Sequence, residues 1–327
     1  MKCVKVGLKH AEKVKIELIR LGVFSNNYYI AKDKDFIYLP VIKNLKNYNV
    51  VNKKLIKREK LSLEDVLRKK LNKKEFKLLV NSYDVVGSVA VLEIDKNLVK
   101  KAKTIANALL KTNKNIKTVV MKSGEHEGKY RIQKCKYLAG VKKFYTLHKE
   151  SGIVLKLNIN KTYYSVRSSN ERLRIAKSVR ESETVLVMFS GIGVYPLVIS
   201  KHSKAKEVYG VEINPDACKY AGENVKLNRA PNVKLFCGDV KAVVPQLNKK
   251  FDRIIMPLPK DSIQFLGLAL ENLNKKGVIN FYCFSREDEI MNFANKISEE
   301  YNVNILSIFK CGQKSPRIYR YCIDFQN

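Results

Sequence analysis

From Asn170 to the C-terminus, the chain alternates short apolar runs with amphipathic stretches, and this alternation constrains its fold more than any other feature. The apolar runs occupy residues 185–189, 208–211, 233–236, 253–256 and 278–283, and two further strand candidates follow at 303–310 and 318–325. Strands that alternate with helices pair in parallel through crossover connections, and helices then cover both faces of the sheet. The pattern predicts a doubly wound, Rossmann-like α/β domain, whose ligands bind in the loops at the carboxyl ends of the strands.

The loops after the first three of these strands carry residues that suit a nucleoside cofactor. Gly191 and Gly193 follow the first strand, and glycines let the backbone approach a ligand closely. Glu212 follows the second strand, where it can accept hydrogen bonds from a ribose, and Asp239 follows the third, where it can accept one from an adenine amino group. Each acid alone is equally consistent with a helix cap or a solvated turn. Together the loops favour S-adenosylmethionine over NAD, because Pro196 stands where a dinucleotide fingerprint needs a small residue.

The fourth strand ends in a rigid turn, Pro257-Leu258-Pro259-Lys260. Many amino-group methyltransferases place an asparagine at the first of these positions, where its side chain holds the nucleophilic amine. Pro257 offers no such acceptor, although a turn with two prolines can form a wall for an aromatic base. A plain connection between strand and helix is the alternative interpretation.

The charge balance indicates a polyanionic partner. The chain has 63 Lys and Arg against 31 Asp and Glu, a formal net charge of +32, and nucleic acid is the commonest intracellular polyanion. An anionic membrane surface and a plain lysine bias are the alternatives. One uncharged run, residues 184–200, is interrupted by glycine and proline and is shorter than the ~20 apolar residues of a transmembrane helix, so we expect no membrane span.

The cysteines and histidines form no metal-binding pattern. The seven cysteines are odd in number and scattered, with no C-x-x-C pair, and none of the four histidines has the spacing of metal ligands. This distribution predicts no metal, argues against a disulfide framework and fits a reducing cytoplasm.

Two smaller α/β domains are predicted before the Rossmann-like one. Residues 1–60 combine a helix at 10–21 with a strand at 36–40, and residues 61–81 form a basic linker with a short helix at 62–71. Residues 82–165 form a β-rich α+β domain, with strands expected at 89–94, 117–122, 130–134, 144–148 and 154–159 and a basic helix at 98–111. The Rossmann-like domain then spans residues 166–327.

Eight short segments resemble, in order, the archaeal and eukaryotic tRNA (guanine-37-N1)-methyltransferases. They are SYDVVG (82–87), KYRI (129–132), HKESG (148–152), SVRSSNER (165–172), FSGIGV (189–194), YGVEINP (209–215), GDV (238–240) and PLPK (257–260). The similarity covers nearly the whole chain, and SYDVVG, HKESG and the NER helix start are its most specific parts. It implies an α/β fold with a Rossmann-like class I methyltransferase domain and two smaller N-terminal α/β domains, the first of which would contact the outer corner of tRNA.

The resemblance also implies a role for each matching residue. Arg131 would lie near O6 of the target guanine, and Glu171 would be the general base that takes the N1 proton. The residues that would line S-adenosylmethionine are Arg172, Phe189, Ser190, Gly191, Glu212, Ile213, Asp239, Val240 and Pro257, and those beside the substrate are Tyr163, Arg167 and Pro259. The chain departs from the family pattern where Pro257 replaces an asparagine, Val187 replaces an aspartate, and Gln133-Lys134 replace an Arg-Glu pair.

These residue types suit the chemistry of methyl transfer to guanine N1. N1 carries a proton at neutral pH, so a carboxylate must remove it as the attack proceeds. Negative charge then builds on O6, where a fixed guanidinium stabilises it. Position 37 lies in a stacked loop, so the base must be extruded into the pocket. Without the resemblance, Glu171 is equally consistent with a first-turn helix acid, and Arg131 with a phosphate contact.

The predicted function is therefore S-adenosylmethionine-dependent methylation of N1 of guanosine-37 in tRNA. We expect a cytoplasmic monomer that binds the anticodon loop and the outer corner of tRNA. Pro257 and the segment Tyr195-Pro196-Leu197 resemble one archaeal subgroup that also methylates C7 of 4-demethylwyosine at position 37. The alternatives are aminocarboxypropyl transfer in wyosine synthesis, methylation of rRNA, and RNA binding without catalysis, of which only the last predicts no binding of S-adenosylmethionine.

Overall fold

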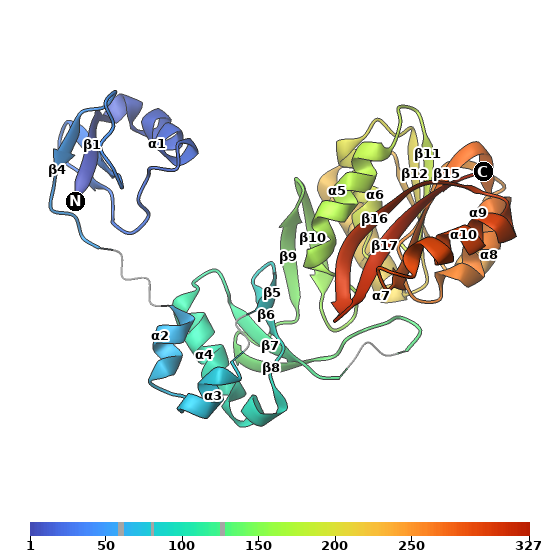
Figure 1. The fold of residues 1–327 in the computed structure, drawn as a ribbon, viewed down its shortest axis with the longest axis horizontal. Coiled ribbons are helices and arrows are strands. Elements are labelled where there is room, and N and C mark those ends of the chain that lie inside the picture. The colour runs from blue at the N-terminus through green and yellow to red at the C-terminus, as the bar shows by residue number, and fades with distance from the viewer. Residues whose placement is uncertain (58–61, 80–81, 125–127) are drawn as a thin grey trace. The chain divides into compact units, whose positions relative to one another are not determined.

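The structure, a computed structural model, describes residues 1–57, 62–79, 82–124 and 128–327 and divides into two compact units, Met1–Leu71 and Asn72–Asn327 (Figure 1). The predicted domain boundaries at 60–61 and 81–82 fall on positions outside the described residues, so they stay predictions.

The first unit is a small sheet that packs against one helix. Its strand order is β2 (Ala31–Lys32), β3 (Phe36–Pro40), β1 (Lys2–Gly7) and β4 (Val50–Asn52), and the pairing is antiparallel. A 3₁₀ turn, η1 (Leu8–His10), leads into α1 (Ala11–Arg20), whose Leu18 is fully buried in a core with Val4 and Leu39. The predicted helix and strand thus form one core. α2 (Leu63–Arg68) begins with a capping box between Ser62 and Asp65.

The second unit opens with a four-stranded sheet. Its order is β5 (Tyr83–Val86), β6 (Val89–Leu92), β7 (Thr118–Lys122) and β8 (Cys135–Gly140). The crossover from β6 to β7 contains η2 (Lys96–Lys101) and α4 (Ala102–Thr112), so these two strands pair in parallel. α3 (Lys73–Lys77) precedes the sheet, and the hairpin of β9 (Tyr145–Glu150) and β10 (Ile153–Asn158) follows it.

The strand predicted at residues 130–134 is wrong. The chain turns there, Arg131 adopts a left-handed backbone with φ of +50°, and β8 begins only at Cys135. The local sequence alternates polar and apolar residues as a strand does, but a left-handed residue cannot continue a strand.

A seven-stranded sheet forms the C-terminal part of the second unit. Its order is β13 (Val233–Cys237), β12 (Glu207–Glu212), β11 (Thr184–Met188), β14 (Phe251–Met256), β15 (Leu273–Ser285), β17 (Ile318–Gln326) and β16 (Asn304–Ser315). The first five strands are parallel, which confirms the predicted doubly wound sheet. β17 inserts antiparallel between β15 and β16.

Helices cover both faces of this sheet (Figure 1). One face packs against α5 (Ser169–Ser178), α6 (Val194–His202) and α7 (Pro215–Asn228), and the other against α8 (Val240–Gln246), α9 (Leu266–Glu271) and α10 (Ile290–Tyr301). Short 3₁₀ turns, η3 (Val166–Ser168) and η4 (Ser262–Phe265), precede α5 and α9. Val185 and Val187 contribute to the first core and Leu186 and Met188 to the second, because successive residues of a strand point to opposite faces. Burial on both sides explains the unbroken apolar run of β11.

The strand order creates a crevice at the carboxyl ends of β11 and β14. From β11 the chain proceeds outward in one direction through β12 and β13, and it then crosses to β14 and β15 on the other side. The loops after β11 and β14 therefore diverge from adjacent points, which is where doubly wound sheets bind ligands.

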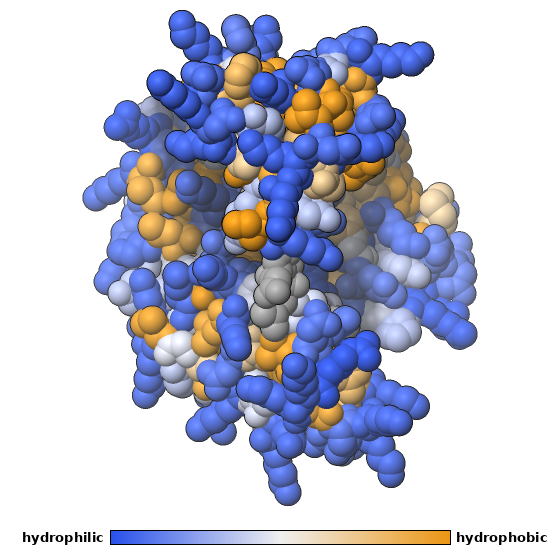
Figure 2. Space-filling view, turned by 90° about the vertical axis from the view of Figure 1, so that its left-hand side faces the viewer, coloured by the Kyte–Doolittle hydropathy of each residue, from blue (hydrophilic) through white to orange (hydrophobic). Residues whose placement is uncertain are grey.

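The surface is consistent with the high charge of the chain. On the face shown in Figure 2, hydrophilic side chains predominate and hydrophobic ones gather only in small groups. Within the part of the chain that the structure describes, no helix combines the length and the apolar character that crossing a membrane requires.

Candidate active site

A cavity of about 360 Å³ opens at the crevice between β11 and β14, and loops from four strand ends line it. Of the residues predicted to bind the cofactor or the base, it brings together Phe189, Gly191, Glu212, Ile213, Asp239, Val240, Pro257, Arg131 and Tyr163. It does not bring Glu171, Arg172, Ser190, Arg167 or Pro259 into its lining. The volume lies within the usual range for small-molecule pockets.

The loop after β11 contributes the side chain of Phe189 and the backbone at Gly191 to the cavity. Phe189 and Gly191 both have left-handed backbones, with φ of +61° and +58°, and Gly193 caps α6 with φ of +82°. A Cβ on Gly193 would lie 3.4 Å from that of Ala221, so this glycine also allows α6 to approach α7. Ser190 is buried below the loop, and its hydroxyl has no hydrogen-bond partner among the described residues.

Glu212, at the end of β12, holds the first loop in place. Its carboxylate accepts hydrogen bonds from the backbone N–H of Gly191 at 2.7 Å and of Asn214 at 2.8 Å. Burial raises the pKa of this carboxyl, and the backbone donors oppose that effect only in part. Since each carboxylate oxygen has two lone pairs, Glu212 can still accept hydrogen bonds from two hydroxyls of a ligand in the cavity.

Asp239 and an apolar slot form the other end of the cavity. Asp239 caps α8 through the backbone N–H of Lys241 at 3.0 Å, and Lys129 lies 3.8 Å from its second oxygen. The rings of Phe189 and Phe265 meet edge to face at 4.9 Å between centroids. Together with Ile213 and Val240, these rings provide apolar walls beside a carboxylate acceptor. A ribose at Glu212 and an adenine between these walls fit the residues present, as S-adenosylmethionine requires.

A second segment, from the connection between β7 and β8, closes one side of the cavity. Gly128, Lys129, Tyr130 and Arg131 all contribute to the lining. The Arg131 guanidinium donates to the backbone carbonyl of Lys260 at 2.8 Å, in the loop after β14. The cavity thus combines this segment with loops that lie far along the chain, since Arg131 and Lys260 are 129 residues apart.

Glu171 lies in a buried polar network rather than in the cavity lining. Its carboxylate accepts two hydrogen bonds from Arg174, both at 2.8 Å, and one from the Tyr282 hydroxyl at 2.6 Å. Tyr195 in turn donates to the Tyr282 hydroxyl at 3.1 Å. Burial raises the pKa of Tyr282 well above its ordinary value, so this hydroxyl stays protonated and remains a donor. These three hydrogen bonds hold the Glu171 carboxylate in a fixed orientation.

Arg172 is likewise buried behind the cavity. It forms a bidentate ion pair with Glu150 of β9 and donates to the backbone carbonyl of Ser165 at 2.9 Å. The Tyr164 hydroxyl also donates to Glu150, and Arg172 lies over the Tyr164 ring. In this structure Arg172 therefore joins the β9–β10 hairpin to α5.

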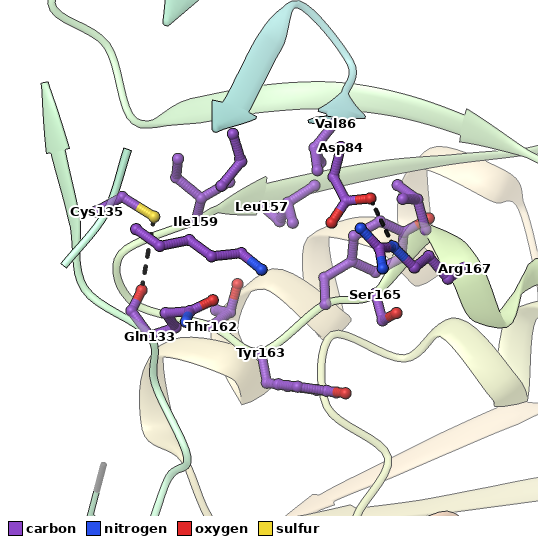
Figure 3. Close-up of a pocket in the computed structure, with 14 residues that line it drawn as sticks. Asp84, Val86, Gln133, Cys135, Leu157, Ile159, Thr162, Tyr163, Ser165 and Arg167 are labelled. Atoms are coloured by element: carbon purple, nitrogen blue, oxygen red, sulfur yellow. Dashed lines mark hydrogen bonds and ion pairs between the residues drawn. The ribbon is translucent and has the colours of Figure 1, made fainter. Parts of the chain in front are cut away.

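A smaller cavity, of about 190 Å³, lies between the four-stranded sheet and the segment before α5 (Figure 3). Tyr163 lines both cavities, and Arg167 lines only this one, where it pairs with Asp84 at 2.9 Å. Leu157 and Ile159 add apolar surface to the same lining (Figure 3). The predicted substrate residues Tyr163 and Arg167 are thus close to the four-stranded sheet, whereas Pro259 contributes to neither lining.

The scattered cysteines argued against a disulfide framework, and the structure has one disulfide among the described residues. Cys218 of α7 and Cys237 at the end of β13 are joined by a disulfide. β12 and β13 pair so that Glu212 is opposite Cys237, which places the end of β13 beside the first turns of α7. Strand adjacency of this kind cannot be deduced from cysteine spacing. No cluster of three or more potential metal-ligating side chains occurs in the described ranges.

Sequence reasoning missed several residues that line the larger cavity. They are Gly128, Lys129, Tyr130, Asn214, Ala217, Leu258, Asp261, Gln264 and Phe265. Asn214 and Leu258 lie inside segments that carried the resemblance, and Asp261 directly follows one, so their proximity to predicted site residues was a usable signal. For Phe265 and Ala217 the chain offers no local signal, because only the packing of η4 and α7 brings them to the cavity.

Family comparisons cover most of the chain. The model of the TRM5/TYW2 methyltransferase domain matches residues 146–306, that of the TYW2 N-terminal domain matches residues 63–143, and that of the tRNA methyltransferase 5 N-terminal domain matches residues 3–49.

Two solved structures share the fold. A complex of aTrm5 and tRNALeu superposes with a TM-score of 0.74 at 29% identity, covering 100% of this chain and 99% of that one. TYW2 of Methanocaldococcus jannaschii in complex with AdoMet superposes with a TM-score of 0.56 at 27% identity, covering 75% and 98%.

Two curated relatives are similar in sequence. The tRNA (guanine(37)-N(1))/4-demethylwyosine(37)-methyltransferase Taw22 of Nanoarchaeum equitans is 31% identical over 266 residues, covering 64% of this chain and 86% of the relative. The tRNA (guanine(37)-N(1))-methyltransferase Trm5b of Pyrococcus abyssi is 36% identical over 333 residues, covering 99% of this chain and 98% of the relative. An identity of this level over the full length shows that the chain belongs to the TRM5/TYW2 methyltransferase family.

Proposed function

We propose that this protein transfers the methyl group of S-adenosylmethionine to N1 of guanosine-37 in tRNA. The observation that carries the proposal is the convergence in one cavity of two carboxylate acceptors, Glu212 and Asp239, with the Arg131 guanidinium. The acceptors suit a nucleoside cofactor, and the guanidinium suits a base on which negative charge develops. The family supports the same reaction, since Trm5b of Pyrococcus abyssi is named for it.

Each residue of the cavity has a proposed task. S-adenosylmethionine supplies an electrophilic methyl group when it is bound. Glu212 accepts hydrogen bonds from the ribose, Asp239 accepts one from the adenine amino group, and Ile213 and Val240 contact the ring. The backbone at Gly191 leaves room for the ligand because no side chain projects there.

Two charged residues act on the base in this proposal. Arg131 donates to O6 and stabilises the negative charge that builds there as N1 is methylated. Glu171 accepts the N1 proton. Its carboxylate has one lone-pair site beyond the three that Arg174 and Tyr282 occupy, and the role requires the bound base to reach this buried group or Glu171 to turn toward the cavity.

The RNA-binding part of the proposal rests on charge. With a formal net charge of +32, the protein attracts the phosphate backbone, and the crossover of the four-stranded sheet, η2 and α4, contains five lysines. We infer that the second unit binds the anticodon loop, that the first unit binds the outer corner of tRNA, and that the protein acts as a monomer in the cytoplasm. Position 37 is extruded from its stack to enter the cavity.

Mass spectrometry of position 37 tests the reaction. Unmodified tRNA is incubated with the protein and labelled S-adenosylmethionine, and the nucleoside at position 37 is then isolated. The expected product is 1-methylguanosine. Unlabelled position 37, with the label in other nucleosides of the tRNA, would contradict the proposal, and failure to bind the cofactor would indicate RNA binding without catalysis.

A second candidate substrate is 4-demethylwyosine at position 37, methylated at C7. The observation that favours it is Pro257, which lines the cavity where a polar grip on a purine edge is usual. A wall that relies on shape tolerates a tricyclic base, because no unmatched buried polar group penalises it. Taw22 of Nanoarchaeum equitans is named for both substrates. Incubation of tRNA that contains 4-demethylwyosine, with the same readout, distinguishes one substrate from two, and transfer of an aminocarboxypropyl group would be visible as a different mass.

A further inference from the structure

We propose that Asp261 is a positioning residue that orients the Arg131 guanidinium for methyl transfer, an inference that rests on the proposed function of the cavity. Asp261 lies in the loop after β14 and Arg131 in the turn before β8, and both line the cavity. This loop after β14, called the fourth loop below, begins with the PLPK segment (257–260). None of its residues beyond that segment was predicted to take part in the reaction.

The Arg131 guanidinium forms two hydrogen bonds to the loop after β14, one to Asp261 and one to Lys260. Nη2 of Arg131 donates to Oδ2 of Asp261 at 3.1 Å and to the backbone carbonyl of Lys260 at 2.8 Å. Two acceptors from consecutive residues on one nitrogen restrict rotation of the planar guanidinium. The orientation of the other two guanidinium nitrogens relative to the cavity is thereby fixed.

The Asp261 carboxylate has no role in capping the helix that it precedes. Asp261 is the N-cap residue of η4, and aspartate at such a position usually accepts a hydrogen bond from the first turn. No side-chain cap hydrogen bond forms here, whereas Asp239 caps α8 through the N–H of Lys241. The carboxylate is therefore directed to Arg131 instead of to its own helix.

The backbones on both sides of the pair are held in an uncommon conformation. Arg131 has φ of +50° and Asp261 has φ of +65°, in the left-handed region that residues other than glycine seldom adopt. Such conformations persist only where the surroundings hold them, and they cluster at ligand-binding and catalytic sites. Phe189, on the opposite side of the same cavity, has φ of +61°. Three residues that line this cavity, Arg131, Asp261 and Phe189, thus have left-handed backbone conformations.

The chemistry of the proposed reaction explains why orientation matters. Negative charge reaches O6 only as N1 loses its proton, so a guanidinium that is already aligned stabilises the transition state without reorganising. Pro257, at the start of the fourth loop, has no polar side chain to orient the base. Asp261 supplies this loop with a polar group that acts on the base indirectly, through Arg131.

The pair is too exposed to act chiefly as a structural bond. The side chains of Arg131 and Asp261 are 29% and 55% exposed, and ion pairs of that exposure contribute little to stability. Substitution of Asp261 is therefore expected to leave the fold intact, which makes its effect on rate interpretable.

A double-mutant cycle tests the inference on the full-length protein. Single-turnover rates of guanosine-37 methylation are measured for the wild type, Asp261→Asn, Arg131→Ala and the double variant, together with the affinities for S-adenosylmethionine and tRNA. We expect Asp261→Asn to slow methyl transfer by about 10- to 100-fold while both affinities and the unfolding temperature stay unchanged. Asp261→Glu should recover part of the rate, because it keeps the carboxylate. In the Arg131→Ala background, Asp261→Asn should cause no further loss, since its effect passes through Arg131.

Asp288→Asn is the matched control, because Asp288 is also an exposed aspartate paired with an arginine, Arg286, at 3.1 Å. It should leave the rate unchanged. The inference is overturned if Asp261→Asn slows both backgrounds equally, if it leaves the rate unchanged, or if its only effect is on affinity. If the wild type transfers no methyl group to guanosine-37, the proposed function itself fails, whereas a normal wild-type rate with additive variants overturns the role of Asp261 alone.

Discussion

The carboxylate of Glu212 lines the larger cavity and accepts a hydrogen bond from the backbone of Gly191 in the loop after β11. Burial raises its pKa above the ordinary value, so it loses its charge at a less acidic pH than an exposed glutamate does. The ionised form accepts more hydrogen bonds than the protonated form. We therefore expect the affinity for S-adenosylmethionine to fall as the pH is lowered through this raised pKa, measured by calorimetric titration from neutral to acidic pH.

Glu212→Gln is the companion variant in that experiment. It should bind the cofactor more weakly at neutral pH and lose the pH dependence, while its affinity for tRNA stays near that of the wild type. Equal cofactor affinities for variant and wild type across the pH range would exclude Glu212 from the cofactor site.

The Glu171 carboxylate is the proposed proton acceptor. Glu171→Gln should slow methyl transfer by about 10²–10⁴-fold at neutral pH, because it cannot take the N1 proton. Part of the rate should return at high pH, where N1 ionises without help. Single-turnover kinetics across pH measure both effects, and Glu181→Gln is the control, since Glu181 is an exposed glutamate paired with Lys204 at 3.0 Å. A wild-type rate in Glu171→Gln would exclude proton abstraction by this residue.

Pro257 lines the larger cavity and offers no polar side chain to a base. Pro257→Asn introduces a donor and an acceptor, which should favour guanosine over a tricyclic base, because an unmatched buried polar group costs ~1–3 kcal/mol. We expect the ratio of the methylation rates for guanosine-37 and 4-demethylwyosine-37 to rise in the variant, with cofactor affinity retained. If the wild type methylates guanosine-37 and leaves authentic 4-demethylwyosine tRNA unlabelled, the second substrate is excluded.

At the scale of elements, the disulfide joins α7, which follows Glu212, to the end of β13, which precedes Asp239. Cys218 lies in α7, six residues after Glu212, and Cys237 lies two residues before Asp239. The bond closes a loop whose ends are 19 residues apart. Closing such a loop stabilises a fold by about 2–4 kcal/mol, chiefly by restricting the unfolded chain. We expect the double variant Cys218→Ser, Cys237→Ser to unfold at a correspondingly lower denaturant concentration than the oxidised wild type.

A reductant provides the control for that measurement. Adding it should lower the stability of the wild type toward that of the double variant and leave the variant unchanged. If oxidised and reduced wild-type protein unfold at the same denaturant concentration, the bond contributes nothing to stability.

At the scale of the whole molecule, charge governs the encounter with RNA. Binding that neutralises phosphates releases counterions. The logarithm of the association constant for tRNA should therefore fall steeply and linearly with the logarithm of the salt concentration. Deletion of residues 1–60 should lower tRNA affinity without lowering the affinity for S-adenosylmethionine, because the cavity lies wholly within the second unit. A salt-independent affinity, or an unchanged affinity in the deletion variant, would contradict the respective expectation.

Local sequence patterns correctly predicted the elements whose conformation depends on residues close to them in the sequence. The parallel sheet, its crossover helices and the loops after β11, β12 and β13 follow from hydrophobic periodicity, because burial on both faces imposes an unbroken apolar run on each central strand. The turn at residues 130–134 could not be predicted in this way. Arg131 adopts a left-handed backbone there, and its guanidinium bonds to Lys260 and Asp261, which lie far along the chain.

The sequence by itself thus determined the α/β fold, the positions of the loops proposed to bind the cofactor and, through short motifs, the family. Tertiary structure alone decided which side chains share a cavity, which cysteines pair, and that Glu171 is held by Tyr282, a residue 111 positions away. The physical reason is range. Backbone periodicity and turn chemistry act over a few residues, whereas an ion pair, a disulfide or a buried hydrogen bond depends on which strands become neighbours, and that order is set by packing across the whole sheet.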